Sequence, residues 1–404
     1  MNKDNIIGAI EMGTAKVVVA IGEIIDGASL NIIGVGESPS QGIMKGEVVD
    51  FQAACTVTHA AILAAESKAG VNLSSAFLAQ TGYHLQGFLN ESSVNIGSSD
   101  SSVMQDDIER VTKDAKNKQL PAERVYIHHI QNPFKLDGRI ITNPLNIQGQ
   151  KLQVGYWSVH GDLRKVRDNI HVVNSFGIKV EDVIISSIAS GSMVADQTEK
   201  MNGILVIDIG RGTTDYAVYR GGYVTQTGVI PIGGDHITND ISLGLRLDRN
   251  QCEIIKKQNL YSNMEDVQDT FTINAENSFV PRNINKNAVI QIIEARMKEL
   301  FSFVRKQIEV DFRLKDLAAG IVLTGGCSRL SHIDRIAKEV FEVDARLGDN
   351  PPWACESLRD PEYSTVLGLL HYALRSQEKK GILKVQKPGI LNKVAKMFNN
   401  LSLG

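Results

Sequence analysis

Two segments about half a chain apart carry the same pattern of residues. Residues 6–13 read I-I-G-A-I-E-M-G and residues 203–210 read G-I-L-V-I-D-I-G, so that Glu11 matches Asp208 and the two final glycines match. In each copy a strand-like apolar run leads into a carboxylate and a glycine. An internal repeat of this kind predicts a duplicated architecture of two related α/β lobes, because each copy specifies the same supersecondary unit.

The turns after both runs have the composition of phosphate-binding loops. Residues 13–15 read G-T-A, and residues 210–214 read G-R-G-T-T. Glycine lets several backbone N–H groups converge on a phosphate, and threonine hydroxyls add donors. One such turn often only closes a hairpin, but two at matched places favour phosphate binding. A third turn, T-G-G with Gly325 and Gly326, either lets a base or ribose pack against the backbone or serves conformation only.

Carboxylates at the strand ends meet the other requirement of a triphosphate, a divalent cation. Magnesium is usually held through water by such groups. Asp208 is the best candidate, and Glu11 faces it from the other lobe. The chain has no G-x-x-x-x-G-K-[ST], and no G-x-G-x-x-G follows its first strand. Both observations argue against a P-loop or dinucleotide-binding fold.

The composition excludes several other classes of protein. A chain of 404 residues can form two or more domains, and a net charge of −3 gives no field that would recruit nucleic acid. The four cysteines lie far apart without a C-x-x-C pair, which indicates a reducing compartment and argues against zinc. The apolar N-terminal stretch is interrupted by Glu11 and Lys16, so we expect neither a signal peptide nor a membrane span.

Four motifs together resemble those of the actin-like ATPases, which close two duplicated lobes over ATP and magnesium. They are I-E-M-G-T-A-K, D-I-G-R-G-T-T-D, C-E-I-I-K and V-L-T-G-G-C. Within that superfamily the chain is similar to the bacterial cell-division family FtsA. The stretches that carry this resemblance are I-I-G-V-G-E-S-P-S-Q-G-I-M-K-G-E-V-V-D, I-P-I-G-G-D-H-I-T-N-D-I, Y-S-T-V-L-G-L-L-H-Y-A and a module inserted after Gly82. The resemblance covers about residues 5–375.

The resemblance implies a set of nucleotide-site residues. The ATP phosphates would be bound by Gly13, Thr14, Ala15, Lys16, Gly210, Gly212, Thr213 and Thr214. Ribose and adenine would be bound by Glu253, Lys256, Gly325 and Gly326, and magnesium would be held through water by Asp208 and Glu11. Without that context, Glu253 and Lys256 would mean only a solvated ion pair on a helix.

Two residues depart from the family pattern, and one role stays unassigned. Glu11 stands where actin and the chaperone ATPase have aspartate, and Arg211 stands where the family usually has glycine. Arg211 either adds a cation beside the phosphates or points outward. Hydrolysis needs a positioned water, and the sequence identifies no catalytic residue for it. The resemblance implies at most a weak ATPase.

The resemblance and the changes of composition together predict six regions. They are a first lobe (residues 1–84 and 161–200), an inserted α+β subdomain (85–160), a second lobe (201–240 and 311–375), its small subdomain (241–310), a linker (376–388) and an amphipathic helix (389–404).

The predicted C-terminal helix is basic and amphipathic. Residues 379–404 hold six lysines and no acid. Such a helix can lie in the headgroup region of anionic lipid, where each lysine contributes about 1 kcal/mol. The alternative is a helix docked on its own domain. The residues predicted to contact membrane are Ile390, Leu391, Lys393, Val394, Lys396, Met397, Phe398 and Leu401.

The resemblance therefore implies an ATP-binding protein that forms filaments on the cytoplasmic face of the cell membrane at the division site. There it would anchor the C-terminal tail of FtsZ and recruit later divisome membrane proteins. Its expected cofactors are ATP and magnesium, its further partners are copies of itself and anionic lipid, and nucleic acid is not expected. The alternatives are a pilus-assembly relative of the PilM type and an enzyme of the sugar-kinase type on the same superfold.

Overall fold

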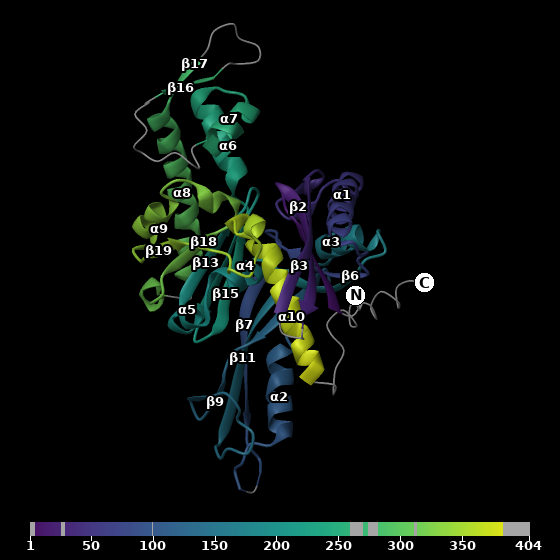
Figure 1. Ribbon diagram of the computed structural model, residues 1–404. Coiled ribbons are helices and arrows are strands. Elements are labelled where there is room, and N and C mark those ends of the chain that lie inside the picture. Colours follow the sequence, from purple (N-terminus) through teal and green to yellow (C-terminus); the bar gives the residue numbers. More distant parts are fainter. Residues whose placement is uncertain are drawn as a thin grey trace.

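Two α/β lobes lie side by side, with the inserted subdomain at one end and a small subdomain at the other (Figure 1). The computed structural model describes residues 5–25, 29–98, 100–258, 270–273, 282–310 and 313–382. The predicted membrane helix and most of the linker lie outside these residues. No helix in the described part of the chain is long and apolar enough to cross a membrane.

The central sheets of the two lobes have the same strand order. The first sheet runs β12 (Lys179–Ile185), β6 (Ser75–Gln80), β1 (Ile6–Met12), β2 (Lys16–Ile25) and β3 (Ser29–Pro39). The second runs β19 (Ala345–Leu347), β18 (Ile321–Thr324), β13 (Ile204–Ile209), β14 (Thr214–Arg220) and β15 (Tyr223–Ile230). In the first sheet, β1 pairs antiparallel with β2 and, on its other side, parallel with β6. In the second sheet, β13 pairs antiparallel with β14 and, on its other side, parallel with β18. The predicted duplication is therefore confirmed.

Helices cover both faces of the first sheet. Helix α1 (Phe51–Ala69) starts at the side-chain cap of Asp50 and ends at Gly70, which has a φ of 67°. It packs very closely on β3, because a Cβ at Gly36 would lie 2.0 Å from the carbonyl oxygen of Ala61. The remaining helices of this lobe are α3 (Leu163–Asn174), α4 (Ser186–Val194) and α5 (Gln197–Asn202).

The last helix, α10 (Ser364–Ile382), falls in the range predicted for the second lobe but packs on the first. Its buried Leu369, Leu370 and Ala373 share a core with Ile7 and other residues of β1, β2 and β6. A Cβ on Gly368 would lie 2.0 Å from the carbonyl oxygen of Ala189 in α4, so the two helices touch backbone to backbone. The chain thus returns to the first lobe at its end.

The small subdomain and the rest of the second lobe share one core with the second sheet. The long helix of this part of the chain is α8 (Lys286–Ile308), which starts at the side-chain cap of Asn285. The neighbouring elements are α6 (Gly234–Leu245), α7 (Arg249–Gln258), β16 (Thr270–Ile273), β17 (Arg282–Asn285) and α9 (Ile333–Phe341).

The inserted subdomain has its own sheet and core. Its elements are β7 (Gln86–Asn95), α2 (Gln105–Lys116), β8 (Arg124–Gln131), β9 (Phe134–Leu136), β10 (Arg139–Ile141) and β11 (Lys151–Asp162). Two contacts fix it to both lobes. His128 Nε2 accepts a hydrogen bond from the backbone N of Ile185 at 3.2 Å, and Trp157 Nε1 donates to Thr227 Oγ1 at 3.0 Å.

Two buried histidines lie where the insert joins the first lobe. His84 Nδ1 accepts from the backbone N of Asp162 at 3.1 Å, and His160 Nδ1 accepts from Arg124 Nε at 2.6 Å. Burial lowers the pKa of each imidazole to about 4, and the Arg124 charge acts in the same direction. Glu47 and Asp162 oppose the lowering at His84 without cancelling it.

Acid should weaken this junction. Between pH 7 and pH 5 the unfolded chain protonates a histidine of ordinary pKa 6.5, whereas native His84 stays neutral. The stabilisation present above pH 6.5 is therefore lost as the pH falls toward 4. We expect the wild type to lose about 2 kcal/mol more than His84→Gln over this interval, measured by urea unfolding. Glutamine retains an acceptor but does not titrate, so equal losses would contradict the assignment.

Candidate functional site

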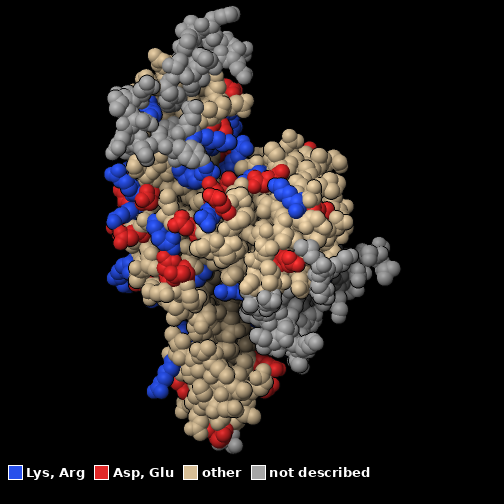
Figure 2. Space-filling model, viewed as in Figure 1, with Lys and Arg blue, Asp and Glu red and all other residues tan. Residues whose placement is uncertain are grey.

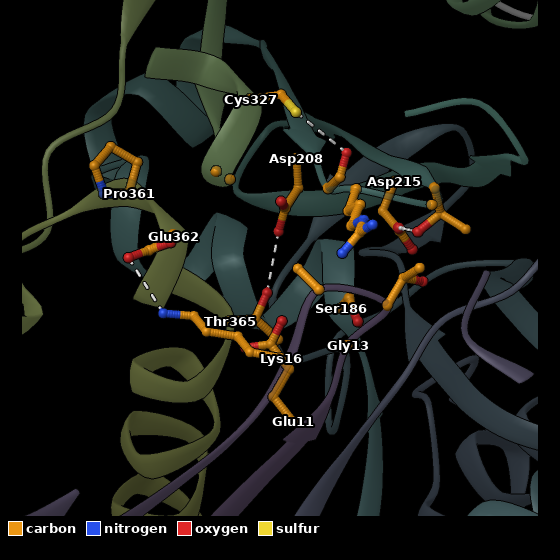
Figure 3. A pocket seen from close by; sticks show the side chains of 18 of the residues that line it. Glu11, Gly13, Lys16, Ser186, Asp208, Asp215, Cys327, Pro361, Glu362 and Thr365 are labelled. Carbon is orange, nitrogen blue, oxygen red and sulfur yellow. Dashed lines mark hydrogen bonds and ion pairs between the residues drawn. The ribbon is translucent and has the colours of Figure 1, made fainter. Parts of the chain in front are cut away.

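A cavity of about 490 Å³ lies between the two lobes and is lined by the turns that the sequence predicts to bind phosphate. Figure 3 shows the side chains that reach into it from both lobes. Of the predicted nucleotide-site residues, those that line it are Glu11, Gly13, Thr14, Ala15, Lys16, Asp208, Gly210, Gly212, Thr213, Glu253, Lys256, Gly325 and Gly326. The fold therefore brings together residues that are more than three hundred positions apart in the sequence.

The first turn joins β1 to β2. The backbone N of Gly13 donates to the carbonyl of Lys16 at 3.1 Å, which closes the hairpin tightly. A Cβ at Gly13 would lie only 2.8 Å from that carbonyl oxygen, so glycine is required for this approach. Thr14 Oγ1 accepts from the backbone N of Lys45 at 2.9 Å.

The second turn has the same geometry, with Gly210 N donating to the carbonyl of Thr213 at 2.9 Å. Thr213 lines the cavity and donates to Asp215 Oδ2 at 3.1 Å. Thr214, which was predicted to bind phosphate, does not line it. Its side chain is fully buried, and its hydroxyl donates to the carbonyl of Ile232 at 2.8 Å. The strand pairing of β14 therefore turns this side chain away from the cavity.

Three carboxyl groups reach the cavity from β1, β13 and β14 (Figure 3). Burial and, after it, the charge of the nearby Asp208 raise the pKa of Glu11 to about 8, against the opposing charge of Lys16. Burial raises the pKa of Asp208 to about 6, although hydrogen bonds from Ser190 and Thr365 act against it. Burial also raises the pKa of Asp215 to about 7. Burial and crowding of this kind disfavour the charged forms of the three carboxyl groups, and a bound cation would favour them.

These groups fit a magnesium site of the kind that the sequence predicts. Glu11 Oε2 is buried and has no hydrogen-bond partner, so it is free to accept from a cation-bound water. Asp208 Oδ2 is oriented by Thr365 Oγ1, which donates to it at 3.0 Å. Magnesium commonly keeps several waters and uses one or two carboxylates together with substrate phosphates. Among the described residues no three His, Cys, Asp or Glu side chains form a direct metal-binding group.

The pair on α7 is not solvated. Lys256 is 4% exposed, and its Nζ lies 2.6 Å from Glu253 Oε2. The ammonium also donates to Thr238 Oγ1 at 2.9 Å and to the carbonyl of Gly234 at 3.1 Å. The pKa of Glu253 is lowered by Lys256 and Thr238 despite the opposing effect of burial. Both side chains line the cavity, so the interpretation as a surface ion pair is wrong.

The two glycines after β18 serve different purposes. Gly325 has a φ of 85°, and a Cβ there would lie 2.3 Å from Asp208 Oδ1. Any side chain at this position would displace the carboxylate. A Cβ at Gly326 would meet nothing nearer than Glu362 at 3.8 Å, so this glycine leaves an open wall against which a flat group can lie. The conformational role is thus realised at Gly325, whereas the packing of a base or ribose against Gly326 stays a prediction.

Two basic residues at the cavity are already paired. Lys16 Nζ lies 3.0 Å from Glu37 Oε2 and 3.2 Å from Glu362 Oε1, so its binding of a phosphate would compete with these carboxylates. Arg211 Nε lies 2.8 Å from Asp235 Oδ1, and its side chain is 43% exposed. Arg211 lines the cavity, but its guanidinium group is oriented by the ion pair with Asp235.

Sequence reasoning missed several lining residues. Thr81 and Ser186 follow β6 and β12 directly, and Thr81 Oγ1 donates to Asp215 Oδ1 at 2.6 Å. The carboxyl ends of parallel strands are the expected site for ligands, which is a signal that could have identified both. Thr365 reaches the cavity from the start of α10 and Glu362 from the short 3-10 helix just before it, and no local motif indicates that return.

Comparisons with known proteins agree with this architecture. A family model described as Cell division protein FtsA matches residues 205–368, and one described as SHS2 domain inserted in FTSA matches residues 82–160. The chain is 32% identical to the Cell division protein FtsA of Pseudomonas aeruginosa over 375 residues, which cover 91% of this chain and 89% of that protein.

Solved structures of lower identity show the fold alone, which is that of the actin-like ATPases. The PilM-PilN type IV pilus biogenesis complex gives a TM-score of 0.61 at 16% identity, covering 91% of this chain and 98% of that chain. MreB5 of Spiroplasma citri bound to ADP gives 0.56 at 14% identity, covering 95% and 100%. The predicted fold, with two duplicated lobes and an insert, is thereby confirmed.

Proposed function

This chain belongs to the FtsA family of cell division proteins, and we propose that it binds ATP with magnesium in the cavity between its lobes. The proposal rests on one observation, which is that two matched glycine turns and the carboxylates beside them line the same cavity. The turns would hold the phosphates, with Asp208 and Glu11 holding the cation through water. Bound magnesium would neutralise the phosphate charge and that of the crowded carboxylates. Glu253 and Lys256 would contact the ribose and adenine.

We further propose that the protein forms filaments, binds the C-terminal tail of FtsZ and recruits later divisome proteins. Large apolar side chains on the insert are exposed, with Ile140 71% and Ile147 39% accessible. The face of the insert seen in Figure 2 carries few charges, whereas acidic and basic side chains intermingle over the second lobe. Leu243 and Ile254, on α6 and α7 of the small subdomain, are also exposed and are candidates for contact with the FtsZ tail.

The proposed place of action is the cytoplasmic face of the membrane at the division site, reached through residues 389–404. These residues lie outside the described part of the chain, so support comes from their amphipathic, lysine-rich sequence. Filament formation would multiply a modest affinity of each tail for anionic lipid.

Calorimetry with the full chain tests the proposal directly. We expect saturable binding of ATP that strengthens with magnesium, and binding of a peptide with the sequence of the FtsZ C-terminal tail but not of its scrambled form. Binding of ATP without the peptide would favour a PilM-like role, for which the shared fold is the only support. Failure to bind ATP at all would refute the assignment of the cavity.

Replacing Lys256 should weaken nucleotide binding. Lys256→Met removes a buried donor and leaves Glu253 with only Thr238 and the exposed Lys257 as partners. Losing one partner of a fully buried pair costs about 3–5 kcal/mol, and the cost is smaller here because Glu253 is 24% exposed. We expect ATP affinity to fall at least about tenfold, measured by calorimetry.

A second variant separates loss of binding from loss of stability. Glu253→Gln combined with Lys256→Met also removes the charge that lost its main partner, so stability should recover while ATP binding stays weak. Lys298→Met breaks an exposed ion pair of Lys298 with Glu339 and should change neither property. If the double variant bound ATP normally, the pair would have only a structural role.

A further inference from the structure

A short hairpin of the first lobe lies against both phosphate turns. Strands β4 (Ile43–Met44) and β5 (Glu47–Val48) are joined by Lys45 and Gly46, whose φ angles are 51° and 78°. The backbone N of Lys45 donates to Thr14 Oγ1 at 2.9 Å. A Cβ at Gly212 would lie 2.5 Å from the same hydroxyl and 3.1 Å from the Lys45 nitrogen. The backbone of Lys45 therefore sits where the two turns approach each other most closely.

The second lobe presents His236 to this hairpin. The start of α6 is docked on the second turn, because Gly234 N donates to the carbonyl of Gly210 at 3.0 Å and Asp235 N donates to that of Arg211 at 2.9 Å. His236 Nδ1 accepts from the backbone N of Gly233 at 3.2 Å. This contact fixes the imidazole in the first turn of α6 and leaves Nε2 available for a second partner.

The contact between the two side chains lacks an acceptor. Lys45 Nζ lies 3.5 Å from His236 Nε2. A neutral imidazole has one accepting nitrogen, and Nδ1 already accepts from Gly233, so Nε2 carries the proton. An ammonium group, which only donates, thus faces an N–H that also donates. Both N–H donors therefore need an acceptor atom that lies between or beside the two side chains.

Nearby carboxylates do not supply that atom. Glu47, on the same hairpin, lies 2.7 Å from the ammonium of Lys165. Asp235, beside His236, is engaged by Arg211 at 2.8 Å. The pKa of His236 is lowered by burial and then by the charge of Lys45, and the opposing charge of Asp235 does not cancel the lowering. Lys45 and His236 therefore disfavour a second positive charge at this place unless an anion is bound.

We propose that Lys45 and His236 together bind a phosphate group, with Lys45 Nζ and His236 Nε2 each donating to its oxygens. Neither residue belongs to the described lining of the main cavity, so the site lies behind the phosphate turns. Its occupant is inorganic phosphate set free from ATP, or the terminal phosphate of ATP itself if the turns part. The source of the phosphate, though not the site, rests on the proposed function. Because the pair spans the lobes, a bound phosphate would hold them together.

Titration of inorganic phosphate into the full chain, labelled with ¹³C at histidine Cε1, tests the site. His236→Gln assigns the signal, and the other histidines are internal controls. With ADP and magnesium present, we expect the His236 signal to shift saturably with phosphate but not with chloride at equal ionic strength. Lys45→Met should weaken the binding of phosphate about tenfold. Lys45→Arg should retain binding, and Lys179→Met, which removes a surface lysine paired with Glu181, should change nothing.

A non-hydrolysable ATP analogue distinguishes the two sources. If it shifts His236 without added phosphate and blocks later phosphate binding, the terminal phosphate occupies the site. If only free phosphate acts, the site receives the released ion. No saturable shift in either arm, or an unchanged phosphate affinity in Lys45→Met, would overturn the proposal. ADP affinity, measured on the same samples, distinguishes the failure of this proposal from the failure of the proposed nucleotide binding. Normal ADP binding without any effect of phosphate would refute only the phosphate site at Lys45 and His236.

Discussion

Substitution of Asp208 by alanine is expected to abolish magnesium-dependent ATP binding. Asp208 is oriented by Thr365 and faces Glu11, so it is the central carboxylate on the cation side of the cavity. Its loss removes a charge-assisted contact to the cation's water shell in a buried place. We expect the affinity for ATP in magnesium to fall at least about a hundredfold, or about 3 kcal/mol, by calorimetry. Unchanged affinity would refute the assignment.

The stability of the nucleotide-free variant separates this effect from misfolding. Asp208 helps to raise the pKa of Glu11, so its charge is unfavourable in the empty cavity. The isosteric Asp208→Asn should therefore be at least as stable as the wild type in thermal unfolding while losing magnesium dependence. Asp235→Asn is a matched control, because Asp235 pairs with Arg211 on the cavity rim and should leave the magnesium dependence intact.

Removal of the C-terminal helix is expected to abolish membrane binding. In liposome pelleting with ATP and magnesium, the full chain should pellet with anionic vesicles and a chain ending at Lys387 should stay in solution. Residues 388–404 contain the whole predicted apolar face and two of the six lysines of the basic stretch. Loss of a few buried apolar side chains at about 1.5–3 kcal/mol each exceeds what lysines contribute.

Point substitutions in the full chain identify the kind of contact. Phe398→Asp should release the protein from vesicles of any composition, because it places a charge on the apolar face. Replacing Lys393 and Lys396 by glutamine should weaken binding mainly to anionic vesicles. If the truncated chain pelleted as well as the full one, the tail would not be the anchor, and the adaptor role would lose its main support while the fold stayed unaffected.

The sequence by itself determined the duplicated lobes and most of the nucleotide cavity. Each phosphate turn is local, because its glycines, threonines and flanking carboxylate follow one another within a few residues. The two copies of the strand-and-turn pattern were equally local, and the structure places them at matched positions in the two sheets. Local chemistry of this kind is readable because no distant contact is needed to specify it.

Tertiary structure alone decided which of these groups meet and how each side chain points. Thr214 turns away from the cavity through strand pairing, and Lys256 is buried although its spacing suited a surface pair. The return of α10 to the first lobe brings Glu362 and Thr365 to the cavity. The facing donors of Lys45 and His236 come from different lobes, 191 residues apart. Such meetings depend on packing between elements distant in sequence, and that information is not contained in any one stretch of the chain.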